Sequence, residues 1–462
     1  MSSNTAEIVP DGAPVENVDI QTENQTDVAD VSISISINEL ILGRPLNQPI
    51  YDEKGVLLLA AGAVITADFK RLLKSRKVEE VTVHKSEVEK LTLRGTGNVI
   101  EASKISFDSE LTKQLDQVID TGALSVINVG DEVRGSLVQH GRKGYDEEYR
   151  EELIQKHEEK SEALTGMMQG ALRGSKVDGR EIAQMTGSFL TDMTADADNL
   201  LTLAAEASKQ EDLSKHCLQM SLLGMAIGVE MGLDADNVRK LSLAGLIHDW
   251  GMALVPDKIR LAERALTNTE FLEIKKHPIY ILEMLQNVTG MPSVVPLVCY
   301  QVHERINGMG YPRGRSGNAI HQFARILQVA DSYVAMTSPR PYRAPLMPYA
   351  AMECLVRQAR EKIVDANAVR ALLQVLSLFP IGSFVTLSDG SVGRVIRRNG
   401  ELYTEPIVQL MQDAEGNTYA EDDDEAVIDI SKHTLAVEQA LPAPGSEEIP
   451  LTTALFQQSL RK

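Results

Sequence analysis

The stretch LSLAGLIHDWG, residues 241–251, decides the fold of the central part of this chain. Its first seven residues are apolar or small, and His248 and Asp249 follow directly. An apolar run that ends on an imidazole and a carboxylate is typical of a buried helix that reaches a polar cavity. We therefore expect a helix here, with its last turn lining such a cavity.

Four of the nine histidines recur at a regular interval around this stretch. They are His216, His248, His277 and His303, separated by 32, 29 and 26 residues, and Asp331 follows 28 residues later. About thirty residues correspond to one helix, a connector and part of the next helix, so a bundle would return to the same end at each position. The alternative, five unrelated core or capping side chains, does not explain the interval.

The residue types in this pattern indicate metal chemistry. Imidazole and carboxylate together suit first-row divalent metals such as iron, manganese or zinc. Asp249 lies beside His248 in the sequence and can bridge two metals while the histidine binds one. Such metals lower the pKa of a bridging water and polarise a phosphoryl oxygen. The sequence therefore predicts a metal-dependent reaction at a phosphoester.

The motifs around these residues resemble a known family. The strings LIHDWG (246–251), HP (277–278), HERINGMGYPRG (303–314) and VADSYVAMTSPRPYR (329–343) are similar to the HD-GYP domain of bacterial signalling proteins. That domain is a helical subfamily of the HD metal-dependent phosphohydrolases, and the resemblance covers about residues 205–375. It implies hydrolysis of the cyclic dinucleotide c-di-GMP to linear pGpG and GMP, with two divalent metal ions, most often iron or manganese.

The resemblance also implies roles for individual residues. The matching metal ligands are His216, His248, Asp249, His277, His303 and Asp331. Arg340 and Arg343 match positions whose basic side chains contact substrate phosphate, a role that suits a planar guanidinium. Gly308, Gly310, Tyr311 and Pro312 match the loop that names the subfamily. Tyr311 would either stack on a base or pack locally.

Four positions depart from the family pattern. Met252 replaces a lysine that reaches substrate phosphate, Val302 replaces a histidine, and Asn307 replaces an aspartate. Asp212 stands where some members have a glutamate ligand for a third metal; it is one methylene shorter, which argues against that third metal.

These departures leave a second function open beside the phosphodiesterase. It is a degenerate HD-GYP protein that binds nucleotide or partner proteins without turnover. A third alternative is an HD hydrolase that acts on another nucleotide or phosphoester. The pattern favours the enzyme, because the remaining ligands form the full set of a dinuclear HD site.

The rest of the chain predicts a mainly α protein: a helical HD-type bundle, a small α+β N-terminal module and a small β-rich C-terminal module. Alternation in VSISISINEL and a short helix over 67–74 indicate the first module, and turns at Asp389-Gly390 and Asn399-Gly400 indicate the last. The expected units are a disordered acidic tail (1–30), the N-terminal module (31–95), a helical region (96–204), the HD-GYP domain (205–378), the β-rich module (379–440) and a C-terminal tail (441–462).

The composition of the chain limits the classes of partner that it is expected to bind. The chain has 462 residues, which suggests about three domains, and its formal net charge is −20. Such an acidic protein is repelled by nucleic acid and by anionic membranes. Three widely spaced cysteines and the lack of a leader or long apolar run predict a cytoplasmic protein. Expected partners are a cyclic dinucleotide and other signalling proteins, and the helices before the bundle are compatible with a homodimer.

Overall fold

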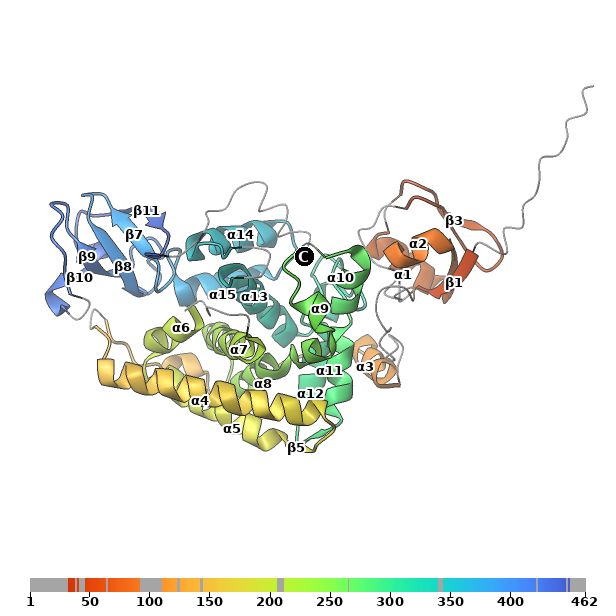
Figure 1. The fold of residues 1–462 in the computed structure, drawn as a ribbon, viewed down its shortest axis with the longest axis horizontal. Coiled ribbons are helices and arrows are strands. Elements are labelled where there is room, and N and C mark those ends of the chain that lie inside the picture. Colours follow the sequence, from red (N-terminus) through yellow and green to blue (C-terminus); the bar gives the residue numbers. More distant parts are fainter. Residues whose placement is uncertain are drawn as a thin grey trace, which may run out of the picture.

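A computed structural model of the chain places a helical body between two small sheets (Figure 1). It describes residues 32–37, 40, 46–63, 65–91, 110–122, 125–141, 144–205, 212–264, 266–339, 344–420, 423–445 and 448. The expected acidic tail, 1–30, lies outside these residues, as does most of the expected C-terminal tail, 441–462. The expectation of a mainly α protein with a small sheet at each end is confirmed.

The N-terminal module is a four-stranded sheet with two helices. Its elements are β1 (Ser32–Ser36), β2 (Ile50–Tyr51), β3 (Leu57–Leu59), α1 (Ala67–Ser75), β4 (Glu80–His84) and α2 (Lys85–Leu91). The strand order is β1-β4-β2-β3, with antiparallel neighbours. The alternation in the sequence places Ile35, Val81 and Val83 in the buried core, and the hydroxyl of Thr66 caps α1 by accepting the N–H of Phe69.

The helical body holds most of the buried side chains. Its elements are α3 (Glu110–Asp120), η2 (Val133–Ser136), α4 (Glu147–Leu172), β5 (Val177–Asp178), α5 (Gly179–Ala195), α6 (Ala197–Ala205), α7 (Leu213–Glu230), α8 (Ala235–Ile247), η3 (Trp250–Leu254), α9 (Asp257–Arg260), α10 (Asn268–Ile274), α11 (His277–Leu285), β6 (Val288–Thr289), α12 (Val294–Gln301), η4 (Gly317–Ala319), α13 (Gln322–Thr337), α14 (Pro348–Arg360) and α15 (Ala366–Leu376).

Helix α7 lies at the centre of this body. It contacts α4, α6, α8, α13 and α15, and nearly all of its side chains are buried. Helices α4 to α6, which belong to the region expected between the modules, share one apolar core with α7. This packing explains the unbroken apolar stretch in α7, because a helix surrounded on all sides needs no polar face.

The C-terminal module is a five-stranded antiparallel sheet. Its elements are β7 (Phe384–Leu387), β8 (Val392–Arg397), β9 (Ile407–Gln412), η5 (Asp424–Ala426), β10 (Val427–Asp429), η6 (Ile430–Lys432) and β11 (Val437–Leu441), in the order β10-β9-β8-β7-β11. Buried Arg397 joins this sheet to the helical body. Its Nη1 and Nη2 donate to the two carboxylate oxygens of Asp196 at 2.9 and 3.0 Å.

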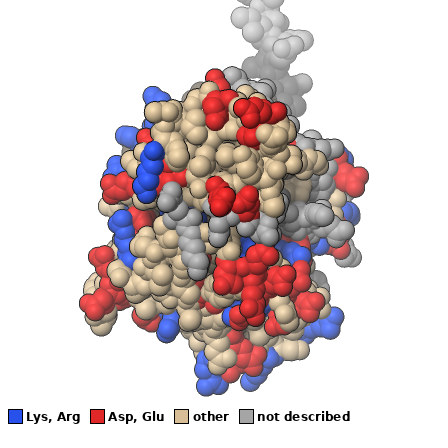
Figure 2. Space-filling model, turned by 90° about the vertical axis from the view of Figure 1, so that its left-hand side faces the viewer, with Lys and Arg blue, Asp and Glu red and all other residues tan. Residues whose placement is uncertain are grey.

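The surface reflects the acidic composition. The face in Figure 2 carries groups of acidic side chains near its middle, with basic side chains mostly toward its rim. Across the described residues, no helix combines the length and apolar character that a membrane crossing requires.

Candidate metal centre

Five structural elements bring the six expected metal ligands together. His216 lies in the first turns of α7, and His248 and Asp249 directly follow α8. His277 is the first residue of α11, just before Pro278 as expected, and Asp331 lies in α13. His303 follows the end of α12 by two residues.

The carboxylate of Asp249 lies at the centre of this group. Its Oδ1 is 3.2 Å from Nε2 of His277, 3.4 Å from Nε2 of His248 and 3.5 Å from Nε2 of His303. Its Oδ2 is 3.7 Å from Nε2 of His216. One carboxylate therefore faces imidazoles from four different segments of the chain.

Asp331 closes the other side of the site. Its Oδ1 is 3.4 Å from Nε2 of His216, and its Oδ2 is 3.8 Å from Nδ1 of His303. Two sets of three side chains have ligand atoms within 4.8 Å of one another: His216, His248 and Asp249, and Asp249, His277 and His303. Asp249 belongs to both sets, as a bridging ligand must.

Backbone carbonyls fix the orientation of two of the imidazoles. Nδ1 of His248 lies 2.9 Å from the carbonyl oxygen of Gly245, and Nδ1 of His277 lies 2.8 Å from that of Ile274. In this geometry each Nδ1–H donates to the carbonyl and leaves the Nε2 lone pair facing Asp249. Metal-binding histidines are held in the same way by an outer partner.

The electrostatics of the site also suit a cation. Nε2 of His216, Nε2 of His248 and Oδ1 of Asp249 are buried and have no hydrogen-bond partner among the described residues. Burial lowers the pKa of His248 to about 4, so its imidazole is neutral at pH 7. Burial alone would raise the pKa of Asp249, but the neighbouring histidines outweigh it and hold that pKa well below its usual value. A carboxylate facing imidazole nitrogens is a donor set that fits divalent metal.

Two glycines allow the close approaches that form the site. A Cβ on Gly251 would lie 2.1 Å from the carbonyl oxygen of His277, so only glycine lets the turn after Asp249 press against the start of α11. A Cβ on Gly310 would lie 2.3 Å from the backbone nitrogen of Arg305, so the loop after His303 can fold back on itself.

The signature loop packs on the ligands. The ring of Tyr311 stacks on the imidazole of His303, with centroids 5.0 Å apart and planes 8° apart. The N–H of Tyr311 donates to the carbonyl of His303 at 3.0 Å. Of the two roles expected for this tyrosine, the structure has it packed against a candidate ligand. Asn307, one of the departures, accepts the N–H of Met309 and so supports the loop turn.

The other departures pack in apolar clusters or cap a helix. Val302 is 1% exposed and belongs to the main apolar core, while Met252 packs with Val255, Ile259 and Tyr280 in a smaller apolar cluster. Asp212 caps α7 by accepting the N–H groups of Ser214 and Lys215. Arg340 and Arg343, expected to contact phosphate, lie outside the described residues.

Two residues near the site were given no role from the sequence. Nη1 of Arg305 lies 3.4 Å from Oγ of Ser332; burial lowers the pKa of Arg305, and the charge of Asp331 opposes that shift. Buried Glu304 accepts the backbone N–H groups of Arg313 and Arg315. Both residues directly follow His303, and that position is the only sequence signal that could have drawn attention to them.

Comparison with known proteins agrees with this geometry. Residues 197–368 match the family described as "HD domain", and the string HERINGMGYPRG lies within that match. Residues 197–368 are therefore an HD domain. Residues 384–441, the C-terminal sheet, match "KOW domain associated with HD domain".

Several curated relatives of this HD-domain chain are named as phosphodiesterases. A cyclic di-GMP phosphodiesterase of Pseudomonas aeruginosa is 30% identical over 249 residues, which are 54% of this chain and 59% of that protein. The cyclic di-GMP phosphodiesterase response regulator RpfG of Xanthomonas campestris is 35% identical over 34% of this chain and 41% of its own length. A 3'3'-cGAMP-specific phosphodiesterase of Vibrio cholerae is 35% identical over 30% of this chain and 32% of its own length. The chain thus spans between about a third and three fifths of these relatives.

Proposed function

We propose that this protein is a metal-dependent phosphodiesterase that hydrolyses c-di-GMP to pGpG and GMP in bacterial second-messenger signalling. The observation that carries the proposal is the sharing of Asp249 by two sets of buried or half-buried metal-ligand side chains. Relatives that cover part of the chain are named for the same reaction.

The ligand assignment follows from the two sets. His216, His248 and Asp249 would hold one divalent metal ion, and Asp249, His277 and His303 the second, with Asp331 beside His216. Iron or manganese suits these nitrogen and oxygen ligands. When bound, a metal pair supplies Lewis-acid charge for a phosphodiester and a water of lowered pKa.

The residues of the chain have three tasks in this proposal. Asp249 fixes the spacing of the two sets, and the carbonyls of Gly245 and Ile274 keep each Nε2 available. Arg305, next to Ser332 and close to Asp331, would bind a phosphate oxygen of the substrate through its planar guanidinium. This arginine would take over part of the role of the lysine that Met252 replaces.

Binding without turnover is the second candidate function. It is favoured by the position of Met252 in an apolar cluster and of Val302 in the core, because neither side chain can replace the expected lysine or histidine. Both ligand sets are present even though the expected lysine and histidine are missing. This favours the enzyme.

The test is metal analysis and turnover on one anaerobic preparation of the whole chain. We expect about two metal ions per chain and release of pGpG or GMP from c-di-GMP, with 3'3'-cGAMP tested in parallel as the competing substrate. Asp249→Ala should lose metal and turnover together, whereas His433→Ala, at an exposed histidine of the C-terminal module, should keep both. Unchanged metal content in Asp249→Ala would refute the site, and metal binding without any product would support the binding protein instead.

The proposed location is the cytoplasm, where this second messenger acts. Cys217, Cys299 and Cys354 are all buried free thiols, which agrees with a reducing compartment.

A further inference from the structure

We propose that helix α3 is a positioning element for the metal centre, and that it acts through Asp116 on the loop of residues 303–315. The inference rests on the proposed metal centre. Helix α3 (Glu110–Asp120) lies outside both family matches, which cover residues 197–368 and 384–441, so nothing in those matches assigns it a role.

Helix α3 is docked on the helices that carry two of the ligands. Leu111, Leu115 and Ile119 recur every four residues on one face of α3 and pack on an apolar patch. That patch consists of Leu272, Ile279, Leu282, Leu297 and Tyr300. Since His277 begins α11 and His303 follows α12, the docked helix lies against the supports of both ligands.

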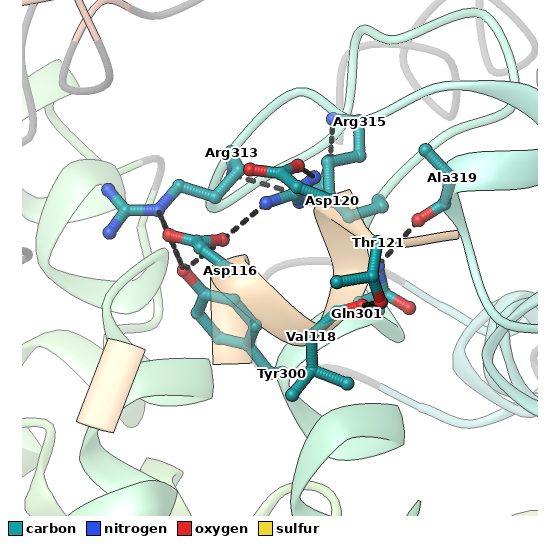
Figure 3. A network of polar contacts seen from close by, with 10 residues as sticks. Asp116, Val118, Asp120, Thr121, Tyr300, Gln301, Arg313, Arg315 and Ala319 are labelled. Carbon is teal, nitrogen blue, oxygen red and sulfur yellow. Dashed lines mark hydrogen bonds and ion pairs between the residues drawn. The ribbon is translucent and has the colours of Figure 1, made fainter. Parts of the chain in front are cut away.

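Acidic side chains on the polar face of α3 contact two arginines of the loop (Figure 3). Oδ2 of Asp116 is 2.9 Å from Nε of Arg313, and Oδ1 of Asp116 is 2.6 Å from Nη2 of Arg315. Nε of Arg313 also donates to the hydroxyl of Tyr300 at 2.7 Å. Asp120 makes one further contact, 2.6 Å from Nη1 of Arg315.

The same two arginines are tied inward to the metal site by their backbone. The N–H groups of Arg313 and Arg315 donate to the carboxylate of Glu304 at 2.7 and 2.8 Å, and Glu304 directly follows His303. Tyr311, two residues before Arg313, stacks on His303. A displacement of Arg313 would therefore disturb Glu304, which follows His303 in the chain, and Tyr311, whose ring stacks on the His303 imidazole.

The burial of these groups distinguishes Asp116 from an ordinary surface ion-pair partner. The side chain of Arg313 is 2% exposed and that of Arg315 10%, whereas Asp120 is 66% exposed. Ion pairs between exposed side chains contribute little, but a buried guanidinium that loses its carboxylate must move or be solvated. We therefore assign the positioning role to Asp116, and Asp120 provides the matched control.

The experiment measures binding of Mn²⁺ to the full-length, metal-free protein by titration calorimetry. Partners that orient metal ligands typically contribute 10- to 100-fold in metal affinity. Asp116→Asn is expected to weaken one of the two Mn²⁺ sites by about tenfold or more and to speed hydrogen exchange in residues 303–315. Asp116→Glu, which keeps the charge, is expected to recover most of the affinity, and Asp120→Asn to remain within about threefold of wild type.

The outcomes separate this inference from the metal centre itself. Wild-type protein that binds Mn²⁺, together with an Asp116→Asn variant of equal affinity and equal exchange, would overturn the positioning role. Wild-type protein that binds no Mn²⁺ would instead overturn the proposed metal centre. If Asp116→Asn does not fold, Arg315→Gln removes one of the two arginine contacts of Asp116 from the loop side, and a loss of Mn²⁺ affinity in the same direction is expected.

Discussion

Gly251→Ala tests the geometry of the metal centre without replacing a ligand. The added Cβ would lie 2.1 Å from the carbonyl oxygen of His277 and 2.8 Å from the backbone nitrogen of Ile281. Ordinary contact begins at 3.4 Å, so α11 has to retreat by about 1.3 Å from the turn that follows Asp249. Both obstacles are backbone atoms of a helix, so a side-chain rotation cannot relieve the clash.

The retreat of α11 should affect one metal and spare the other. His277 lies 3.2 Å from Oδ1 of Asp249 and belongs only to the second ligand set. Metal–ligand distances tolerate about 0.2 Å, so a shift several times larger removes His277 as a ligand. The set of His216, His248 and Asp249 does not include α11. We therefore expect one Mn²⁺ per chain in place of two, with c-di-GMP turnover lost.

The assay is elemental analysis and Mn²⁺ titration of the purified variant. Gly166→Ala is the matched control, because a Cβ there has no atom within 4 Å and Gly166 lies inside α4. That control should keep both metals and gain up to about 1 kcal/mol of stability from the better helix former. A Gly251→Ala protein that binds two metals with wild-type affinity would refute the reasoning.

The remaining predictions concern pH, substrate and the family departures. Burial lowers the pKa of His321 to about 4, whereas a histidine in the unfolded chain has a pKa of about 6.5. Between these pH values the unfolded chain therefore binds more protons than the folded one. The contribution of neutral His321 to the free energy of unfolding is fully present above pH 6.5 and is lost, by up to about 3 kcal/mol, toward pH 4. The His321→Asn variant can still accept the N–H of Phe323. In denaturation experiments its free energy of unfolding should fall less than that of wild type between pH 6.5 and pH 4. An equal fall would contradict the buried imidazole as the cause. Arg305→Ala should raise KM for c-di-GMP about tenfold or more with metal content unchanged, and a KM like that of wild type would remove the phosphate role. Val302→His should lower the free energy of unfolding, measured by thermal unfolding, by about 1–3 kcal/mol, because the core around Val302 is filled. The variant should bind no additional metal, and an additional metal would refute this prediction. Met252 is only partly buried, so a lysine at this position can keep its charged end in solvent, where it can reach substrate phosphate. Met252→Lys should therefore raise c-di-GMP turnover. Unchanged turnover would show that the missing lysine does not limit the rate.

The sequence was sufficient to predict which histidines meet. The interval between His216, His248, His277 and His303 reflects successive helices whose ends meet, and the apolar run before His248 reflects the burial of the last two turns of α8. Both signals are local or periodic in the sequence, so they can be recognised without knowing which residues are in contact. The small sheets could be predicted for the same reason, since strand alternation and turn residues are local features.

The supports of the site could not be predicted in this way. Asp116 and Arg313 are 197 residues apart, and a lone aspartate on an amphipathic helix is most often a solvated side chain. Glu304 has its role only because the loop folds back at Gly310 and brings two backbone N–H groups to its carboxylate. Such contacts depend on tertiary folding, which leaves no periodic signal in the sequence.

The structure also changes what the departure at Val302 means for function. From the sequence, valine in place of histidine reads as a lost ligand. In the fold, Val302 is part of the apolar core, and neither ligand set includes it. Replacing a buried imidazole by valine removes a polar group that would need a partner in the core. The proposed dinuclear site is therefore compatible with Val302, so turnover depends on how substrate phosphate is held, which is the role we assign to Arg305.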